Sequence, residues 1–164
     1  MMRRSLRAGS AALALALAAT APAAATMLAN LTLTTAVTAQ TTGTLQFSNT
    51  YVPTNALIQG TFTYGSGGTS ADAWVQTSAD NGTTWIDVAD FHFTTSNARF
   101  AYNLSSLTPV TTQYTPTDGT LSANTAKDGI IASLWRVKVT TVGTYAGGTA
   151  LRVDIVTTHL TSSP

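Results

Sequence analysis

The sequence predicts an all-β protein, a single antiparallel β-sandwich of jelly-roll or immunoglobulin-like type. Three observations lead to this prediction. The 164-residue chain has no Glu, very few Lys and abundant Thr, a composition that disfavours long exposed helices. Roughly nine short strand-like runs follow one another at a spacing of about ten residues, with turn residues between them. No segment repeats its apolar residues at the spacing of a long amphipathic helix.

The first 26 residues differ in composition from the rest of the chain. An arginine-rich start, a short Ala/Leu run and a small-residue end are the parts of a secretory signal, with cleavage expected after Ala25. Two other interpretations stay open: Met27 is the true start, or the segment is a working N-terminal arm. We therefore divide the chain into a leader or arm, residues 1–26, and a β-sandwich domain, residues 27–164. The apolar run is too short for a good membrane span.

Charge and cysteine content limit the partners that we expect. Without the three arginines of the leader, five basic side chains stand against seven Asp, so the formal charge changes from +1 to about −2. We therefore expect no basic face for nucleic acid. The chain has no Cys, which excludes disulfides, a thiolate metal site and a cysteine nucleophile.

Alternation of apolar and polar residues locates the strands. Residues 57–64 place Ile58 and Phe62 on one face, and residues 91–93 and 98–104 also put their large apolar side chains in phase. Residues 31–40 alternate weakly and suit an edge strand or an extended arm. The two firmest hairpins are expected at residues 71–90 and 133–158. In the second, charged side chains on the polar face are expected to pair across the strands; they are Arg136, Lys138, Arg152 and Asp154.

Residues 78–85 join the two strands of the first predicted hairpin and contain an Asp-Asn-Gly turn. They match the S-x-D-x-G-x-T-W pattern of the Asp box, and the chain here resembles sialidases and other β-proteins in which the box is a hairpin turn away from the catalytic centre. This resemblance implies a structural turn, and direct ligand contact is the alternative. We do not expect sialidase activity, because the box occurs once. The residues that carry the match are Ser78, Asp80, Gly82, Thr84 and Trp85.

The sequence contains none of the familiar catalytic, phosphate-binding or dinucleotide-binding motifs. Asp87 and Asp90 are expected to be solvated carboxylates at a strand end and not a catalytic pair. His92 and His159 have no evident third ligand, so we expect neither a metal site nor a cofactor. The sequence therefore favours a protein that is not an enzyme.

Residues 107–129 form the longest irregular stretch, with a short strand possible at residues 110–114. Loops of this length are usually interaction surfaces. Aromatic side chains at strand spacing are another possible surface, a platform for a sugar or a protein, although we expect most of them in the core. They are Tyr64, Trp74, Trp85, Tyr102 and Tyr145.

Most of the body resembles small virion proteins encoded among the head and tail genes of tailed bacteriophages. The resemblance implies a capsid decoration or minor structural protein that is located in the virion, contacts the major capsid or tail proteins and self-associates. The signal-like leader, the Asp box and the aromatic residues support a second hypothesis, a secreted or cell-surface carbohydrate-binding or adhesin-like module with a glycan ligand. The stretches that carry the phage resemblance are residues 74–85, 103–112, 128–130, 135–149 and 151–154.

Overall fold

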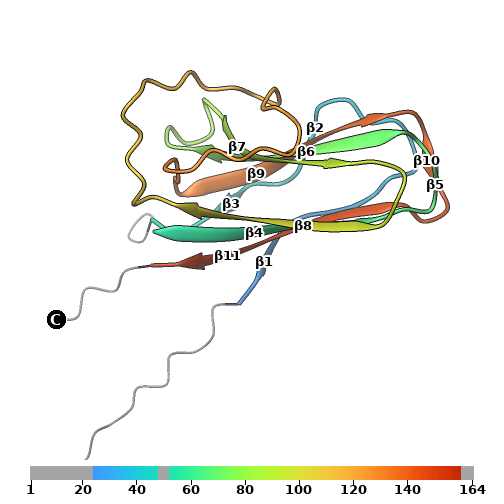
Figure 1. The fold of residues 1–164 in the computed structure, drawn as a ribbon, viewed down its shortest axis with the longest axis horizontal. Coiled ribbons are helices and arrows are strands. Elements are labelled where there is room, and N and C mark those ends of the chain that lie inside the picture. The colour runs from blue at the N-terminus through green and yellow to red at the C-terminus, as the bar shows by residue number, and fades with distance from the viewer. Residues whose placement is uncertain (1–23, 48–51, 160–164) are drawn as a thin grey trace, which may run out of the picture.

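The computed structural model describes residues 24–47 and 52–159, which form strands and connecting segments without a helix (Figure 1). This confirms the predicted all-β class. The strands are β1 Thr26–Thr32, β2 Gln40–Thr41, β3 Leu45–Gln46, β4 Asn55–Thr63, β5 Ser66–Gly67, β6 Ser70–Ser78, β7 Ile86–Phe93, β8 Ala98–Ser105, β9 Leu134–Val142, β10 Tyr145–Ala146 and β11 Ala150–Thr158.

Nearly all of the predicted leader, residues 1–23, lies outside the described residues, so its interpretation stays a prediction. The edge strand predicted at residues 31–40 is displaced: β1 ends at Thr32, and the next pairing begins at Gln40 in β2. Nowhere in the two described ranges does the chain form a helix with the length and apolar character of a membrane span.

Two antiparallel sheets pack face to face as a β-sandwich (Figure 1). Sheet A has the strand order β1-β11-β4-β8. Sheet B has the order β2-β9-β6-β7, and β3 also pairs with β9. A short ribbon of β5 and β10 lies in the two connections that pass from one sheet to the other.

The core lies between the sheets and is built from alternate residues of each strand. In β4, Ile58 and Phe62 are buried as the alternation predicts. Phe62 stacks on Phe93 of β7 with ring centroids 5.0 Å apart. Gly60 lies under the ring of Phe91, where a Cβ would come within 2.8 Å of a ring carbon. The missing side chain therefore lets β7 cross directly over β4.

The hairpin predicted at residues 71–90 is confirmed. Strands β6 and β7 pair from Ala71, opposite Phe93, to Thr77, opposite Ile86. A β-bulge interrupts the register after Val75. Both strands belong to sheet B, and the Asp box sequence forms the turn between them.

The hairpin predicted at residues 133–158 is wrong, because β9 and β11 lie in different sheets. β9 pairs with β6, and β11 pairs with β1 and β4. Alternation shows only that each strand buries one face, and in a sandwich both sheets do so. The predicted cross-strand charge pairs are wrong for the same reason. Arg152 instead pairs with Asp154 of its own strand at 2.7 Å.

Residues 106–133, here named the β8–β9 loop, contain no strand, so the strand considered at residues 110–114 is absent from this described segment. The loop is nevertheless bonded to the edge of β7 that pairs with no strand. The N–H groups of Asp87 and Asp90 donate to loop carbonyls at 3.2 and 2.8 Å, and Lys127 N–H donates to the Val88 carbonyl at 2.8 Å. These bonds cover the edge of sheet B.

Candidate functional site

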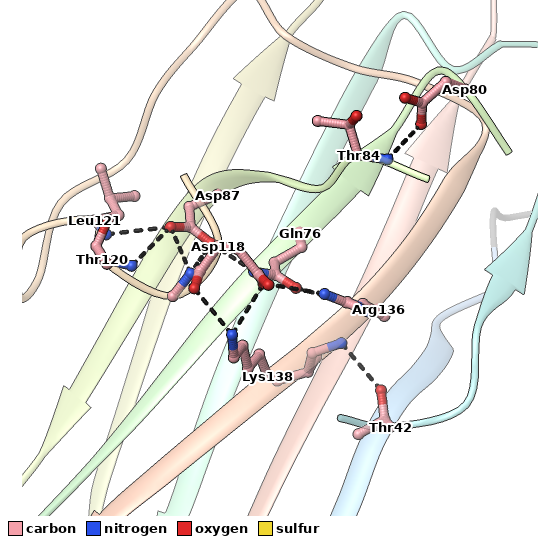
Figure 2. A network of polar contacts seen from close by, with 12 residues as sticks. Thr42, Gln76, Asp80, Thr84, Asp87, Asp118, Thr120, Leu121, Arg136 and Lys138 are labelled. Carbon is pink, nitrogen blue, oxygen red and sulfur yellow. Dashed lines mark hydrogen bonds and ion pairs between the residues drawn. The ribbon is translucent and has the colours of Figure 1, made fainter. Parts of the chain in front are cut away.

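The five residues of the Asp box lie together in the turn between β6 and β7. The Ser78 hydroxyl donates to Asp80 Oδ1 at 2.8 Å and accepts the Gly82 N–H at 2.9 Å. Thr84 N–H donates to the same Asp80 oxygen at 2.8 Å (Figure 2). Asn81 and Gly82 have φ angles of 56° and 85°, which favour Asn and Gly. The side chains of Ser78 and Asp80 thus supply the hydrogen bonds that hold the turn.

Hydrogen bonds fix the charge state of Asp80 although its carboxylate is exposed. The backbone and hydroxyl of Thr84, and then the Ser78 hydroxyl, lower its pKa to about 2. Trp85 follows the turn, is 8% exposed and carries the Arg136 guanidinium 4.0 Å from its ring centroid. This geometry suits a structural turn, and the absence of direct ligand contact stays a prediction.

Replacing Asp80 by Ala is expected to lower the melting temperature at pH 7 by roughly 2–5 °C, because the Thr84 N–H and the Ser78 hydroxyl lose their acceptor. Because the folded-state pKa is depressed, this contribution is present above about pH 4 and is lost as the pH falls through about 2. Thermal melts of the wild type and Asp80→Ala at pH 7 and at about pH 2 measure this loss. Asp80→Asn, which keeps an acceptor oxygen, should lose less; equal melting temperatures for all three proteins would contradict the structural role.

Asp87 is buried at the centre of a hydrogen-bond cluster, so the prediction of a solvated carboxylate is wrong. Its oxygens accept the backbone N–H groups of Gly119, Thr120 and Leu121 at 2.9–3.2 Å. Gln76 Nε2 donates to it at 2.7 Å. A single carboxylate of β7 therefore binds three consecutive peptide groups of the β8–β9 loop (Figure 2).

The same loop turn meets the charged side chains of β9. Asp118 accepts Gln76 Nε2 at 2.8 Å and pairs with Arg136 Nη2 at 3.0 Å and Lys138 Nζ at 3.1 Å. Arg136 Nε also donates to Gln76 Oε1 at 2.7 Å. Partial burial opposes ionisation of Asp118, but hydrogen bonds from Gln76 and Lys138, and the charges of Lys138 and Arg136, hold its pKa below the ordinary value. Side chains of β6 and β9 on the outer face of sheet B thus bind Asp118 of the loop (Figure 2).

Asp90 is also fully buried, contrary to prediction. Its Oδ2 accepts the Asn124 N–H at 3.1 Å, and its Oδ1 has no hydrogen-bond partner among the described residues. Burial raises its pKa to about 7; the Asn124 bond and the charge of His92 oppose the rise, and the charges of Asp72 and Asp87 add to it. The loop is therefore held at a second point by a carboxyl group that titrates near neutral pH.

Both corrections have one physical cause. The side chains of Asp87 and Asp90 stand on the outer face of sheet B, which periodicity predicts to be solvated, but the β8–β9 loop folds back over that face. A signal was present in residues 86–91, where two charges interrupt an otherwise apolar run. The loop-anchoring role of Gln76 carried no sequence signal.

The histidines do not extend this cluster into a metal site. His92 is half-buried as expected, and its Nδ1 lies 2.6 Å from Asp72 Oδ1. Within residues 24–47 and 52–159, no group of three or more His, Asp, Glu or Cys side chains could hold a metal ion. The prediction that no cofactor binds stays a prediction.

The aromatic side chains considered as a platform are distributed through the fold. Trp85 and Tyr145 are buried in or beside the core, as expected for strand spacing. Trp74 is half-buried, and its Nε1–H donates to the Leu121 carbonyl at 3.0 Å, so the loop covers part of its ring. Tyr64 and Tyr102 are also half-buried.

The outer part of the β8–β9 loop presents apolar groups to solvent. Leu107 is 65% exposed and Val110 is 48% exposed, and Val52, which precedes β4, is 48% exposed. Lys127 Nζ lies 3.7 Å from the centre of the Tyr114 ring. A hollow of about 330 Å³ lies in this part of the loop and is lined by Val110, Thr112, Gln113, Tyr114, Lys127, Asp128 and Ile130.

Comparison of this chain with models of protein families, with curated proteins and with solved structures gave no match.

Proposed function

We propose that this chain is a non-enzymatic structural protein of a phage virion, a capsid decoration or minor structural component. It binds a protein lattice through its β8–β9 loop. The supporting observation is the anchoring of that loop: Asp87 and Asp118 fix it to sheet B, while Leu107 and Val110 stay exposed.

Anchoring matters because binding normally has to order a flexible segment. A loop that is already held by several hydrogen bonds loses little conformational entropy when it docks. The acidic side chains in this region bind groups of the protein itself. Asp87 accepts hydrogen bonds from three backbone N–H groups, and Asp118 forms ion pairs with two cationic side chains. The resemblance of the body to small tailed-phage proteins supports the same function.

Two measurements test this proposal. Particles purified from the source should contain peptides of residues 73–99 in a fixed ratio to the major capsid or tail protein. Binding of the purified protein to particles that lack it should weaken roughly tenfold or more in Leu107→Asp, because the charge enters an apolar contact. Val142→Asp is the matched control, since Val142 is 55% exposed but lies at the other end of β9.

The proposal would be abandoned if the protein were absent from every particle fraction and free in the medium. Equal binding of Leu107→Asp and wild type would reject the loop as the contact surface. Melting temperatures of both variants establish that each is folded before binding is compared.

A polar hollow beside the Asp box turn favours a second candidate, a secreted glycan-binding module. The hollow has a volume of about 400 Å³ and is lined by Gln46, Ala79, Asn81, Ser133 and Leu134. Under this alternative, the isolated protein binds glycans on an array, and Asn81→Ala removes that binding while Leu107→Asp does not.

A further inference from the structure

Among the described residues, β8 forms the one long, regular sheet edge that is left open, except at Ser105, whose outward N–H and C=O groups bond Asp128 and Gly129 of the β8–β9 loop. The β7 edge is occupied by the β8–β9 loop. β1 carries a bulge between Met27 and Ala29, and β2 and β3 are two-residue strands. Bulges, short strands and covering loops are the usual ways in which proteins protect sheet edges. In contrast, β8 has eight residues and pairs with β4 in an unbroken register.

The hydrogen bonds at the end of β8 identify which of its backbone groups point outward. Ser106 N–H donates to the Thr54 carbonyl on the β4 side at 2.8 Å. Ser105 N–H instead donates to Asp128 Oδ1 of the loop at 2.5 Å. Backbone groups of an antiparallel strand alternate in direction. The N–H and C=O groups of residues 99, 101 and 103 therefore point away from β4, along the open edge.

We propose that this edge is where two copies of the chain associate. The β8 strand of a second copy pairs antiparallel with β8 about a two-fold axis that passes beside Ala101, so that sheet A continues across both copies. This places on one surface the self-association that the resemblance to phage proteins implies, and the proposal rests on the proposed function for its biological setting.

The edge is self-complementary in this register. Ala101 lies opposite Ala101 of the second copy, and Arg99 lies opposite Asn103, so each outward-pointing residue has a partner and no like charges face each other. On the inner face, Phe100 lies opposite Tyr102. Phe100 is 44% exposed in the single chain although it stacks on Phe93 at 5.7 Å. Pairing therefore covers an aromatic ring that the fold leaves half open.

The second layer of the sandwich leaves room for this approach. β7 crosses over β4, where Phe91 lies on Gly60. The loop segment that bonds to the outer edge of β7 includes Ala126, which bridges to Ala89. That segment therefore follows the edge of β7. Asp128 and Gly129 then bond the outward groups of Ser105, so the loop lies beside β8 only at that end and leaves the outward groups of residues 99, 101 and 103 open to a second copy.

A pair of charge variants at one exposed position tests the register. Asn103→Asp places a carboxylate opposite Arg99 of the second copy, and Asn103→Arg places two cations there. Sedimentation equilibrium of the isolated full chain should show a dimer whose dissociation constant falls in Asn103→Asp and rises in Asn103→Arg, with the two differing roughly tenfold. A monomer at all concentrations up to about 1 mM, or equal constants for both variants, would overturn the proposal.

Cross-linking provides a test that does not depend on small changes in affinity. The chain has no Cys, so Ala101→Cys introduces a single thiol, which should form a disulfide between copies under mild oxidation. Gln59→Cys is the matched control, because Gln59 lies opposite Ala101 on the neighbouring strand and faces the same way. In the dimer the two Gln59 positions are separated by about 14 Å, beyond disulfide reach.

Equal cross-linking of the two cysteine variants would contradict pairing through β8. Both tests use the protein without particles, so their failure would leave lattice binding through Leu107 and Val110 untouched. Conversely, a dimer of the predicted register that does not bind particles would reject the proposed function and retain this interface.

Discussion

Asp87→Ala is expected to lower the free energy of unfolding by about 3–5 kcal/mol, because it leaves three partly buried backbone donors without an acceptor. These donors are consecutive N–H groups of the β8–β9 loop, and their desolvation is compensated by this carboxylate. Gln76 Nε2 also loses a bond to Asp87 but keeps Asp118 as an acceptor. Chemical denaturation at pH 7 measures the loss.

A surface ion pair provides the control for Asp87→Ala. Asp154 pairs with Arg152, whose side chain is 54% exposed, so Asp154→Ala should cost less than about 1 kcal/mol. The Asp87 variant should also become more sensitive to trypsin after Lys127, because the loop loses one of its attachments to sheet B. If Asp87→Ala costs no more than Asp154→Ala and Lys127 stays protected, Asp87 does not anchor the loop.

Asp90→Asn is expected to stabilise the protein at pH 8 by on the order of 3 kcal/mol more than it does at pH 5. Burial raises the folded-state pKa of Asp90 from 3.8 to about 7. The folded state therefore binds the proton more tightly than the unfolded state, and the stability that this provides is lost as the pH rises from about 4 through about 7. Asn stays neutral throughout this range.

Urea denaturation of the wild type and Asp90→Asn at both pH values tests the sign and size of this effect. The charge of His92 is one of the influences on Asp90. Repeating the comparison in a His92→Gln background separates the two groups. A difference between Asp90→Asn and wild type that is the same at pH 5 and pH 8 would show that Asp90 is not the titrating group.

The elements that periodicity predicted well are those whose burial depends on their own strand. Ile58 and Phe62 face the core because β4 buries one face whatever its neighbours are. The turn at Ser78 and Asp80 could also be predicted, since its hydrogen bonds are formed within eight consecutive residues. Local chemistry was sufficient in both cases.

Long-range partners could not be predicted from the sequence. The alternation of β9 and β11 is the same whether the strands pair side by side or face each other across the core, and only the strand order distinguishes the two. The burial of Asp87 depends on the position of Gly119, 32 residues further along the chain. A candidate site that consists of such contacts becomes visible only in the folded protein.

The position of β11 has a consequence for how this chain reaches its fold. β11 lies between β1 and β4, and its register joins Thr26 to Ile155 and Ile58 to the same residue. During synthesis, sheet A therefore cannot be completed until β11 has left the ribosome, and until then β1 and β4 have no strand between them. Contacts between residues so distant in sequence make folding slow, on the order of milliseconds to seconds, and expose such intermediates to aggregation.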